Sequence, residues 1–200
     1  MFSVGLTGGI ASGKTTISNL FAELDVPIID TDVISRNLLA PGERAYHQVC
    51  AHFGNEILQD NNEIDRVALR KIIFSNPPQK FWLETMLHPL IFQRSHDAIV
   101  ENSRAIYVLV VVPLLFETNF QSLVDRILVV DCPRDQQIRR LVKRDNIDEA
   151  LAHSMLKQQL SNEERLQRAH DVINNRDDKA DLASQVEALH RSYTILAADK

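Results

Sequence analysis

A glycine-rich stretch near the start of the chain has the residue types and spacing to bind phosphate groups. Residues 8–15 read Gly-Gly-Ile-Ala-Ser-Gly-Lys-Thr and fit the pattern G-x-x-x-x-G-K-[ST]. In such a loop the backbone N–H groups turn toward a polyphosphate at the N-terminus of the following helix. Lys14 would reach the β- and γ-phosphates of ATP, and the Thr15 hydroxyl would take one position on Mg²⁺. The predicted nucleotide-binding residues in this stretch are Gly8, Gly9, Ile10, Ala11, Ser12, Gly13, Lys14, Thr15 and Thr16.

Two acidic residues, Asp30 and Asp32, follow the next apolar stretch of the chain, residues 26–29. In a parallel sheet the carboxyl ends of the strands face the ligand crevice, so both carboxylates would lie near the polyphosphate. One carboxylate would help to hold Mg²⁺, and the other would take the proton of an attacking hydroxyl group. The residue types alone leave open which acid does which; we expect Asp30 at the metal and Asp32 at the hydroxyl group. The alternative is that one of the two acids only caps the following helix.

A basic cluster at residues 134–145 carries five Lys and Arg residues against two Asp residues. Arg140 and Arg144 are four residues apart, which places them on one face of a helix. Arginines delivered by a mobile lid would stabilise the charge that phosphoryl transfer spreads over the equatorial oxygens. We therefore predict that Arg140 and Arg144 are catalytic and that Arg134 tolerates substitution. The alternative is an ordinary solvated basic face.

The elements around these residues alternate between strand and helix. Val-, Ile- and Leu-rich runs such as residues 106–112 are typical of strands buried on both faces of a parallel sheet. We expect a helix from Pro77 toward Glu101 that Pro89 interrupts, and another helix with Pro133 as its first residue. Strands are predicted at residues 2–6, 26–29, 106–112, 126–131 and 172–173.

This pattern predicts an α/β fold, with a five-stranded parallel sheet flanked by helices. Residues 34–103 contain no convincing strand and would form a helical insertion that receives the second substrate. Residues 134–165 would form the helical lid. The predicted core of this single domain consists of residues 1–33, 104–133 and 166–200.

Composition limits the classes of protein that fit. The chain has 200 residues, 44% of them hydrophobic, and a formal net charge of −5, which argues against a broad nucleic-acid or membrane surface. The two cysteines, Cys50 and Cys132, lack metal-binding spacing and indicate reduced thiols. No signal peptide is evident, and the longest apolar run is too short to span a bilayer. We expect a cytoplasmic protein.

A phosphate-binding loop alone leaves three classes open: a small-molecule kinase, a regulatory GTPase and a nucleotide-dependent switch ATPase. The GTPase would need an Asn-Lys-x-Asp string, which the sequence lacks. The switch ATPase needs an apolar strand ending in a metal-organising carboxylate, and Asp131 offers this only superficially. The paired acids and the basic cluster favour the kinase.

Several further motifs resemble the bacterial dephospho-coenzyme A kinase family. The phosphate-binding loop and the D-x-D-x-x-x-R pattern ending at Arg36 are similar to two of its signatures. Leu-His-Pro-Leu-Ile at residues 87–91 and Val-Pro-Leu-Leu-Phe-Glu at residues 112–117 resemble two others. The late segment with Gln159, Arg165 and residues 169–175 resembles a fifth.

The resemblance implies a P-loop kinase that uses ATP and Mg²⁺ to phosphorylate the ribose 3′-hydroxyl of dephospho-coenzyme A. With the net charge of −5, we expect dephospho-coenzyme A as a small-molecule partner and no nucleic-acid or membrane partner. A nucleoside monophosphate kinase or sugar kinase is the alternative within the same class. By resemblance Asn175 joins the nucleotide-binding residues. The implied substrate-binding residues are Asp32, Arg36, His88, Pro113, Leu114 and Glu117.

The chain departs from the family pattern in the segment expected to contact adenine. His170 stands where the family usually has Asp, and Arg176-Asp177 stands where it has a Gly soon after Asn175. These departures concern the adenine contacts and leave the predicted reaction unchanged.

Overall fold

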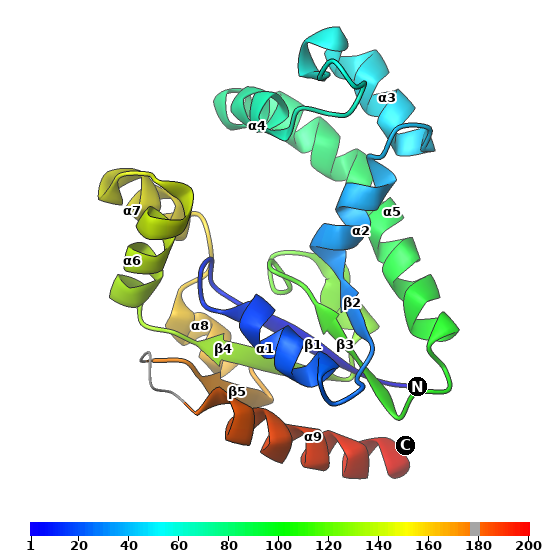
Figure 1. The fold of residues 1–200 in the computed structure, drawn as a ribbon, viewed down its shortest axis with the longest axis vertical. Helices are drawn as coiled ribbons and strands as arrows, with labels where there is room; N and C mark the ends of the chain where they lie inside the picture. The colour runs from blue at the N-terminus through cyan, green and yellow to red at the C-terminus, as the bar shows by residue number, and fades with distance from the viewer. Residues whose placement is uncertain (177–180) are drawn as a thin grey trace. The chain divides into compact units, whose positions relative to one another are not determined.

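A computed structural model describes residues 1–176 and 181–200 (Figure 1). Within them a five-stranded sheet has the order β2-β3-β1-β4-β5, and every neighbouring pair is parallel. The predicted five-stranded parallel sheet is therefore confirmed. Its strands are β1 (Phe2–Gly8), β2 (Ile28–Asp30), β3 (Tyr107–Val111), β4 (Arg126–Asp131) and β5 (Asp171–Asn174).

The chain forms two compact units. The first contains residues 1–30 and 98–200, and the second contains Thr31–Asp97. The sheet lies wholly in the first unit, which we call the nucleotide unit. The second unit is helical and includes most of the segment predicted as an insertion, and we call it the helical unit.

One face of the sheet is covered by two helices that pack side by side, α1 (Lys14–Ala22) and α9 (Leu182–Ala198) (Figure 1). Ile17 and Phe21 of α1 and Tyr193 of α9 are fully buried against sheet residues such as Leu6 and Leu128. Burial of this kind stabilises a fold by about 1.5–3 kcal/mol for each large apolar side chain. This shared core holds β1 and α1 together, and the glycine-rich loop connects these two elements.

The remaining helices of the nucleotide unit lie between β3 and β5 in the chain. They are η2 (Asn119–Leu123), α6 (Arg134–Asp145), α7 (Glu149–Lys157) and α8 (Asn162–Gln167). Helices α6 and α7 have a small core of their own, made by Ile138, Leu141, Ala152 and Leu156. Ile10 and Ala11 of the glycine-rich loop pack against this core. The predicted lid segment is thus a helical hairpin in contact with that loop.

The helical unit consists of α2 (Thr31–Leu38), α3 (Arg44–Phe53), η1 (Asn55–Ile57), α4 (Arg66–Ser75) and most of α5 (Pro77–Glu101). Asp65 caps α4 as expected, because its side chain accepts hydrogen bonds from the backbone N–H groups of Val67 and Ala68. The described residues of this unit form no strand beyond one isolated bridge between Leu58 and Ile64.

Two expectations about prolines were wrong. Pro89 lies inside an unbroken helix, and Pro133 is the N-cap of α6, whose first residue is Arg134. Pro133 has an extended backbone conformation (φ −59°, ψ 145°), so the helix begins one residue later than expected. No helix in residues 1–176 or 181–200 combines the length and apolar character that crossing a membrane requires.

Candidate nucleotide and acceptor site

The glycine-rich loop joins the end of β1 to the start of α1 and has two left-handed residues, Ala11 (φ 57°) and Gly13 (φ 101°). A Cβ atom on Gly13 would lie only 2.3 Å from Nδ2 of Asn175. Glycine is therefore required at this position by backbone angle and by space together. This backbone geometry is compatible with the phosphate-binding loop that the sequence predicts.

The polar groups of this loop fit a polyphosphate. The Lys14 ammonium donates to the carbonyl oxygens of Gly8 (2.8 Å) and Gly9 (3.0 Å), so it lies folded over the loop. The hydroxyl oxygen of Ser12 is fully buried and has no hydrogen-bond partner among the described residues. Thr15 and Thr16 follow on the first turn of α1 and are exposed.

The carboxyl ends of the strands meet at one edge of the sheet, and the loop begins at this edge. Asp30 is the last residue of β2 and lies in register with Val111, which in turn lies opposite Leu6 of β1. Because β3 separates β1 from β2, Asp30 lies about 10 Å from Leu6 in the plane of the sheet, two residues before β1 ends at Gly8. This distance suits a carboxylate that acts on a bound phosphate or its metal rather than on the loop itself.

Thr15 and Asp30 offer oxygen ligands of the kind that Mg²⁺ prefers. Among the described residues no cluster of three or more His, Cys, Asp or Glu side chains could hold a metal ion. A site of one hydroxyl and one carboxylate still fits Mg²⁺, because this ion usually takes phosphate oxygens and water for its remaining positions.

Asn175, directly after β5, and Arg140 of α6 both lie beside the loop. The buried Asn175 amide donates to the backbone oxygen of Ser12 (2.7 Å), and its oxygen accepts from Arg140 (3.4 Å). Arg140 also donates to the sulfur of Cys132 (3.6 Å). Asn175 therefore braces the loop, and it holds Arg140 close to Gly13.

Arg144 lies one helical turn beyond Arg140 and is oriented differently. Its guanidinium forms two hydrogen bonds to the carboxylate of Asp145, at 2.7 and 2.8 Å, and its side chain is 58% exposed. These hydrogen bonds raise the pKa of Arg144 above its ordinary value. Partial burial of the side chain opposes this shift but does not cancel it. To contact a nucleotide, Arg144 would have to leave the Asp145 carboxylate and bind phosphate oxygens instead.

The segment after β3 runs along the same edge of the sheet. The carbonyl oxygen of Pro113 accepts a weak hydrogen bond from Thr7 (3.4 Å), next to the loop. Leu114 is exposed, and Glu117 accepts from the backbone N–H of Leu160 (3.2 Å). Of the three predicted substrate-binding residues here, Leu114 and Glu117 are on the surface and Pro113 supports Thr7.

Two residues that hold the loop in place received no role from the sequence. Gln159, between α7 and α8, accepts a hydrogen bond from the backbone N–H of Ile10 (2.9 Å). The same oxygen accepts from Arg165 (3.4 Å), whose side chain is almost fully buried. Burial lowers the pKa of Arg165, and the nearby charges of Glu117 and Glu164 oppose this shift. The only sequence signal for this pair was its place in a motif that resembles the family.

Comparison with known proteins decides the family. A family model described as dephospho-CoA kinase matches residues 2–181. The chain belongs to the dephospho-CoA kinase family. Dephospho-CoA kinase from Vibrio parahaemolyticus is 45% identical over 194 residues, which cover 96% of this chain and 95% of that protein.

Solved structures agree with the fold of the dephospho-CoA kinase family. The crystal structure of TT1252 from Thermus thermophilus matches with a TM-score of 0.80 at 26% identity, covering 96% of this chain and 97% of that one. Dephospho-CoA kinase from Campylobacter jejuni matches with a TM-score of 0.72 at 24% identity and the same coverage. The predicted P-loop kinase fold is confirmed.

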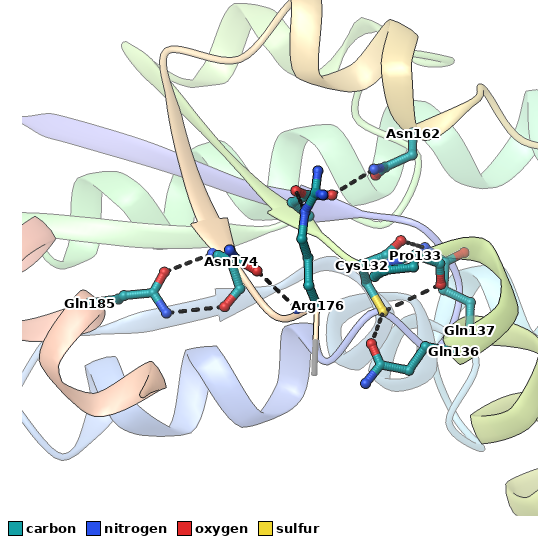
Figure 2. Close-up of polar contacts among 9 residues, drawn as sticks. Cys132, Pro133, Gln136, Gln137, Asn162, Asn174, Arg176 and Gln185 are labelled. Atoms are coloured by element: carbon teal, nitrogen blue, oxygen red, sulfur yellow. Dashed lines mark hydrogen bonds and ion pairs between the residues drawn. The ribbon is translucent and has the colours of Figure 1, made fainter. Parts of the chain in front are cut away.

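The departures from the dephospho-CoA kinase pattern have structural uses in this member. His170 accepts the backbone N–H of Ile127 through its ring nitrogen Nδ1 (3.0 Å), a contact at the start of the β4–β5 pairing. Arg176 binds the carboxylate of Asp131 (2.6 Å), which also accepts from Asn162 (2.7 Å) (Figure 2). Asp131 is thus part of a polar network with Arg176 and Asn162. Asp177 lies outside the described residues.

Figure 2 also shows how the β5 end is held. Asn174 exchanges two hydrogen bonds with Gln185 of α9, and Gln137 of α6 donates to the carbonyl oxygen of Cys132 (2.9 Å). A Cβ atom on Gly9 would lie 2.8 Å from the Gln137 amide. The first residues of α6 therefore pack against the loop as closely as Asn175 does.

The remaining predicted site residues of the chain belong to the helical unit. Asp32 lies in the first turn of α2, which begins directly after β2. Arg36 lies one turn further along α2, and its Nε donates to the backbone oxygen of Asp32 (3.1 Å). His88 lies in the middle of α5 and is exposed, directly before Pro89.

The contact between Gln159 and Ile10 gives a first prediction. Gln159→Leu removes the acceptor of the Ile10 N–H group, and loss of such a hydrogen bond costs about 1–3 kcal/mol when the donor stays buried. We expect the KM for ATP to rise about tenfold, with a smaller change in kcat. Steady-state kinetics of Gln159→Leu beside Gln158→Leu, an exposed neighbour, will measure this. Equal kinetics in the two variants would contradict a role of Gln159 in holding the loop.

Proposed function

We propose that this chain transfers the γ-phosphoryl group of ATP to the ribose 3′-hydroxyl of dephospho-CoA and forms CoA and ADP. The observation that carries the proposal is the family match over residues 2–181, which includes a phosphate-binding loop of the required geometry. The name of the Vibrio relative supports the same substrate.

The loop supplies the binding of the phosphates. Its N–H groups and the first turn of α1 attract the negative charge of the polyphosphate, and Lys14 neutralises part of it. Thr15 and Asp30 are the residues that would hold Mg²⁺, and the bound ion would screen the β- and γ-phosphates. Gln137, Gln159 and Asn175 keep the loop in this shape before nucleotide binds.

Asp32 is our candidate for the group that receives the proton of the 3′-hydroxyl. It follows Asp30 by two residues at the carboxyl end of β2, the side of a parallel sheet on which ligands bind. A carboxylate within hydrogen-bond reach of the attacking oxygen orients it and accepts its proton as the new bond forms.

The hairpin of α6 and α7 is our candidate for the lid. Its core is separate from that of the sheet, and Ile10 and Ala11 of the loop pack against it. Closure of such a segment excludes water and delivers Arg144 to the transferring phosphoryl group. Arg140 is already beside the loop and would bind the nucleotide in the ground state.

We retain the cytoplasm as the proposed location. The support is chemical, since Cys50 and Cys132 are both free thiols.

Asp32→Asn tests the proton acceptor. The change removes the basic oxygen and preserves the volume of the side chain, so kcat should fall at least about 100-fold. The Kd for ATP should stay within a factor of about two, because the phosphates are held elsewhere. Asp60→Asn, at an exposed turn of the same unit, is the control. Normal turnover of Asp32→Asn would show that Asp32 has no catalytic role and only contributes an acidic side chain to the first turn of α2.

An ADP-release assay with a panel of acceptors tests the function itself. Dephospho-CoA should accelerate ADP release strongly, whereas nucleoside monophosphates and simple sugars should not. Release that depends equally on another acceptor would assign the chain to a different small-molecule kinase. Slow hydrolysis that no acceptor changes would favour a nucleotide-dependent switch.

A further inference from the structure

Helix α8 carries a buried cation beside the phosphate-binding loop. Arg165 is only 3% exposed. Within residues 1–176 and 181–200 its guanidinium forms one hydrogen bond, to Oε1 of Gln159 at 3.4 Å, and no ion pair. A guanidinium has five donors, and burial of a charge without a close partner is costly. The position of Arg165 therefore needs a compensating charge nearby.

Two carboxylates compensate this charge, and they come from different parts of the chain. Burial lowers the pKa of Arg165, and the charges of Glu117 and Glu164 oppose this shift. Glu164 belongs to α8 itself, where it accepts from the backbone N–H and the hydroxyl of Ser161 in a capping box (2.9 and 2.7 Å). Glu117 comes from the segment between β3 and η2, and its Oε1 accepts from the backbone N–H of Leu160 (3.2 Å). The charge of Glu117 thus ties Arg165 to the carboxyl edge of the sheet.

The guanidinium of Arg165 also determines which end of the Gln159 amide faces the loop. Oε1 of Gln159 accepts from the backbone N–H of Ile10 (2.9 Å) and from Arg165 (3.4 Å). A guanidinium donates hydrogen bonds and cannot accept them, so it selects the amide oxygen over the NH2 group. With the amide turned round, its NH2 group would face two donors, and the N–H of Ile10 would lose its acceptor. Arg165 therefore keeps Gln159 in the orientation that the loop requires.

A second arginine docks α8 on the same segment without reaching the loop. The guanidinium of Arg168 lies 5.8 Å from the ring centre of Phe116, which is buried directly before Glu117. An arginine over an aromatic ring is a favourable contact. Among the described residues Arg168 has no hydrogen bond to Gln159. The two arginines thus separate the docking of α8 from the support of the loop.

We propose that Glu117, Arg165 and Gln159 form a link from the segment after β3 to the phosphate-binding loop, with Arg165 as its positioning residue. Glu117 holds the guanidinium, the guanidinium orients the Gln159 amide, and the amide holds the N–H group of Ile10. Glu117 therefore serves the binding of ATP, whereas the family resemblance implied a place in acceptor binding. The link rests on the proposed function only for the identity of the acceptor.

Glu117→Gln tests the outer end of the link. The change preserves the shape of the side chain and an oxygen for Leu160, and it removes the charge that faces Arg165. Titration calorimetry should show a Kd for ATP that is higher by about three- to tenfold and an unchanged Kd for dephospho-CoA. Glu163→Gln, at an exposed position of α8, is the matched control and should resemble the wild type. Weaker binding of dephospho-CoA, or unchanged binding of both ligands, would overturn the link.

A double-mutant cycle tests whether Arg165 acts through Gln159. Arg165→Met should raise the Kd for ATP, and the double variant with Gln159→Leu should bind ATP about as weakly as Gln159→Leu alone, because both changes break the same link. Additive losses would overturn the link. Arg165→Lys should recover part of the affinity, since an ammonium group can still donate to Oε1. Arg168→Met, on the same helix, should leave the Kd for ATP unchanged.

Thermal unfolding of each variant separates positioning from stability. If Arg165→Met does not fold, the cycle of Glu117→Gln with Gln159→Leu replaces it, and the same lack of additivity is expected. A lower melting temperature with a normal Kd for ATP would show a purely structural role for Arg165 and overturn the proposal. Failure of the wild type to phosphorylate dephospho-CoA would instead refute the proposed function, and the ATP measurements would still judge the link.

Discussion

Lys14→Ala should abolish ATP binding and phosphoryl transfer together, with kcat/KM lower by about 10³-fold or more. The Lys14 ammonium donates to the carbonyl oxygens of Gly8 and Gly9, which places it over the loop. A polyphosphate offers it charged oxygens in place of neutral ones, and charge-assisted hydrogen bonds are about twice as strong as neutral ones. Removing a donor that faces developing charge typically costs about 10²–10³-fold, and Lys14 also contributes to ground-state binding.

Lys143→Ala provides the control for this variant, because it removes the same charge from an exposed position on α6. The Kd for ATP, measured by calorimetry, and the steady-state constants should both be close to the wild-type values in the control. ATP binding of normal affinity to Lys14→Ala would contradict the placement of the phosphates on this loop.

Arg144→Ala should lower kcat by about 10³-fold, the lower end of the effect of arginine fingers. Arg144 is exposed and bound to Asp145 before nucleotide arrives, so its contact with phosphate would form only as the lid closes. Interactions that strengthen only in the transition state lower kcat and kcat/KM equally when they are lost. Arg144→Lys should rescue the activity poorly, because a point charge cannot replace a planar fork.

Arg140 should behave differently because it is already held beside the loop by Asn175. Arg140→Ala should raise the KM for ATP more than it lowers kcat, since a group in place before catalysis binds ground state and transition state alike. Arg134→Ala, at the exposed start of α6, should change neither constant. Small and equal changes in kcat and KM in all three Arg→Ala variants would indicate that the basic cluster is an ordinary solvated surface. Such a result would contradict the proposed role of the lid.

The sheet could be predicted because its signal is local. Each strand contains at least two adjacent apolar residues, and Tyr107–Val111 is buried at every position. The break expected at Pro89 was wrong for a tertiary reason. Leu83, Leu87 and Ile91 form a stripe at intervals of four residues, all buried, and this burial outweighs the hydrogen bond that proline removes.

The phosphate-binding loop could also be predicted, because its chemistry depends on adjacent backbone groups. The residues that support the loop could not. Gln159 bonds to Ile10 across 149 residues of chain, and Asn175 bonds to Ser12 across 163. No periodicity reports contacts of such length, and Gln and Asn are ordinary surface residues until the fold buries them. The D-x-D-x-x-x-R pattern, by contrast, lies within ten residues and could be recognised directly.

The position of the new phosphate in the product tests the central claim most directly. Dephospho-CoA, ATP and Mg²⁺ are incubated with the protein, and the product is examined by ³¹P NMR with proton coupling. We predict one new phosphomonoester signal, coupled to the hydrogen on the ribose 3′ carbon, in amounts equal to the ADP released. A monoester on any other position, or ADP release without a new monoester, would contradict the assignment of this chain as a kinase of the dephospho-CoA 3′-hydroxyl.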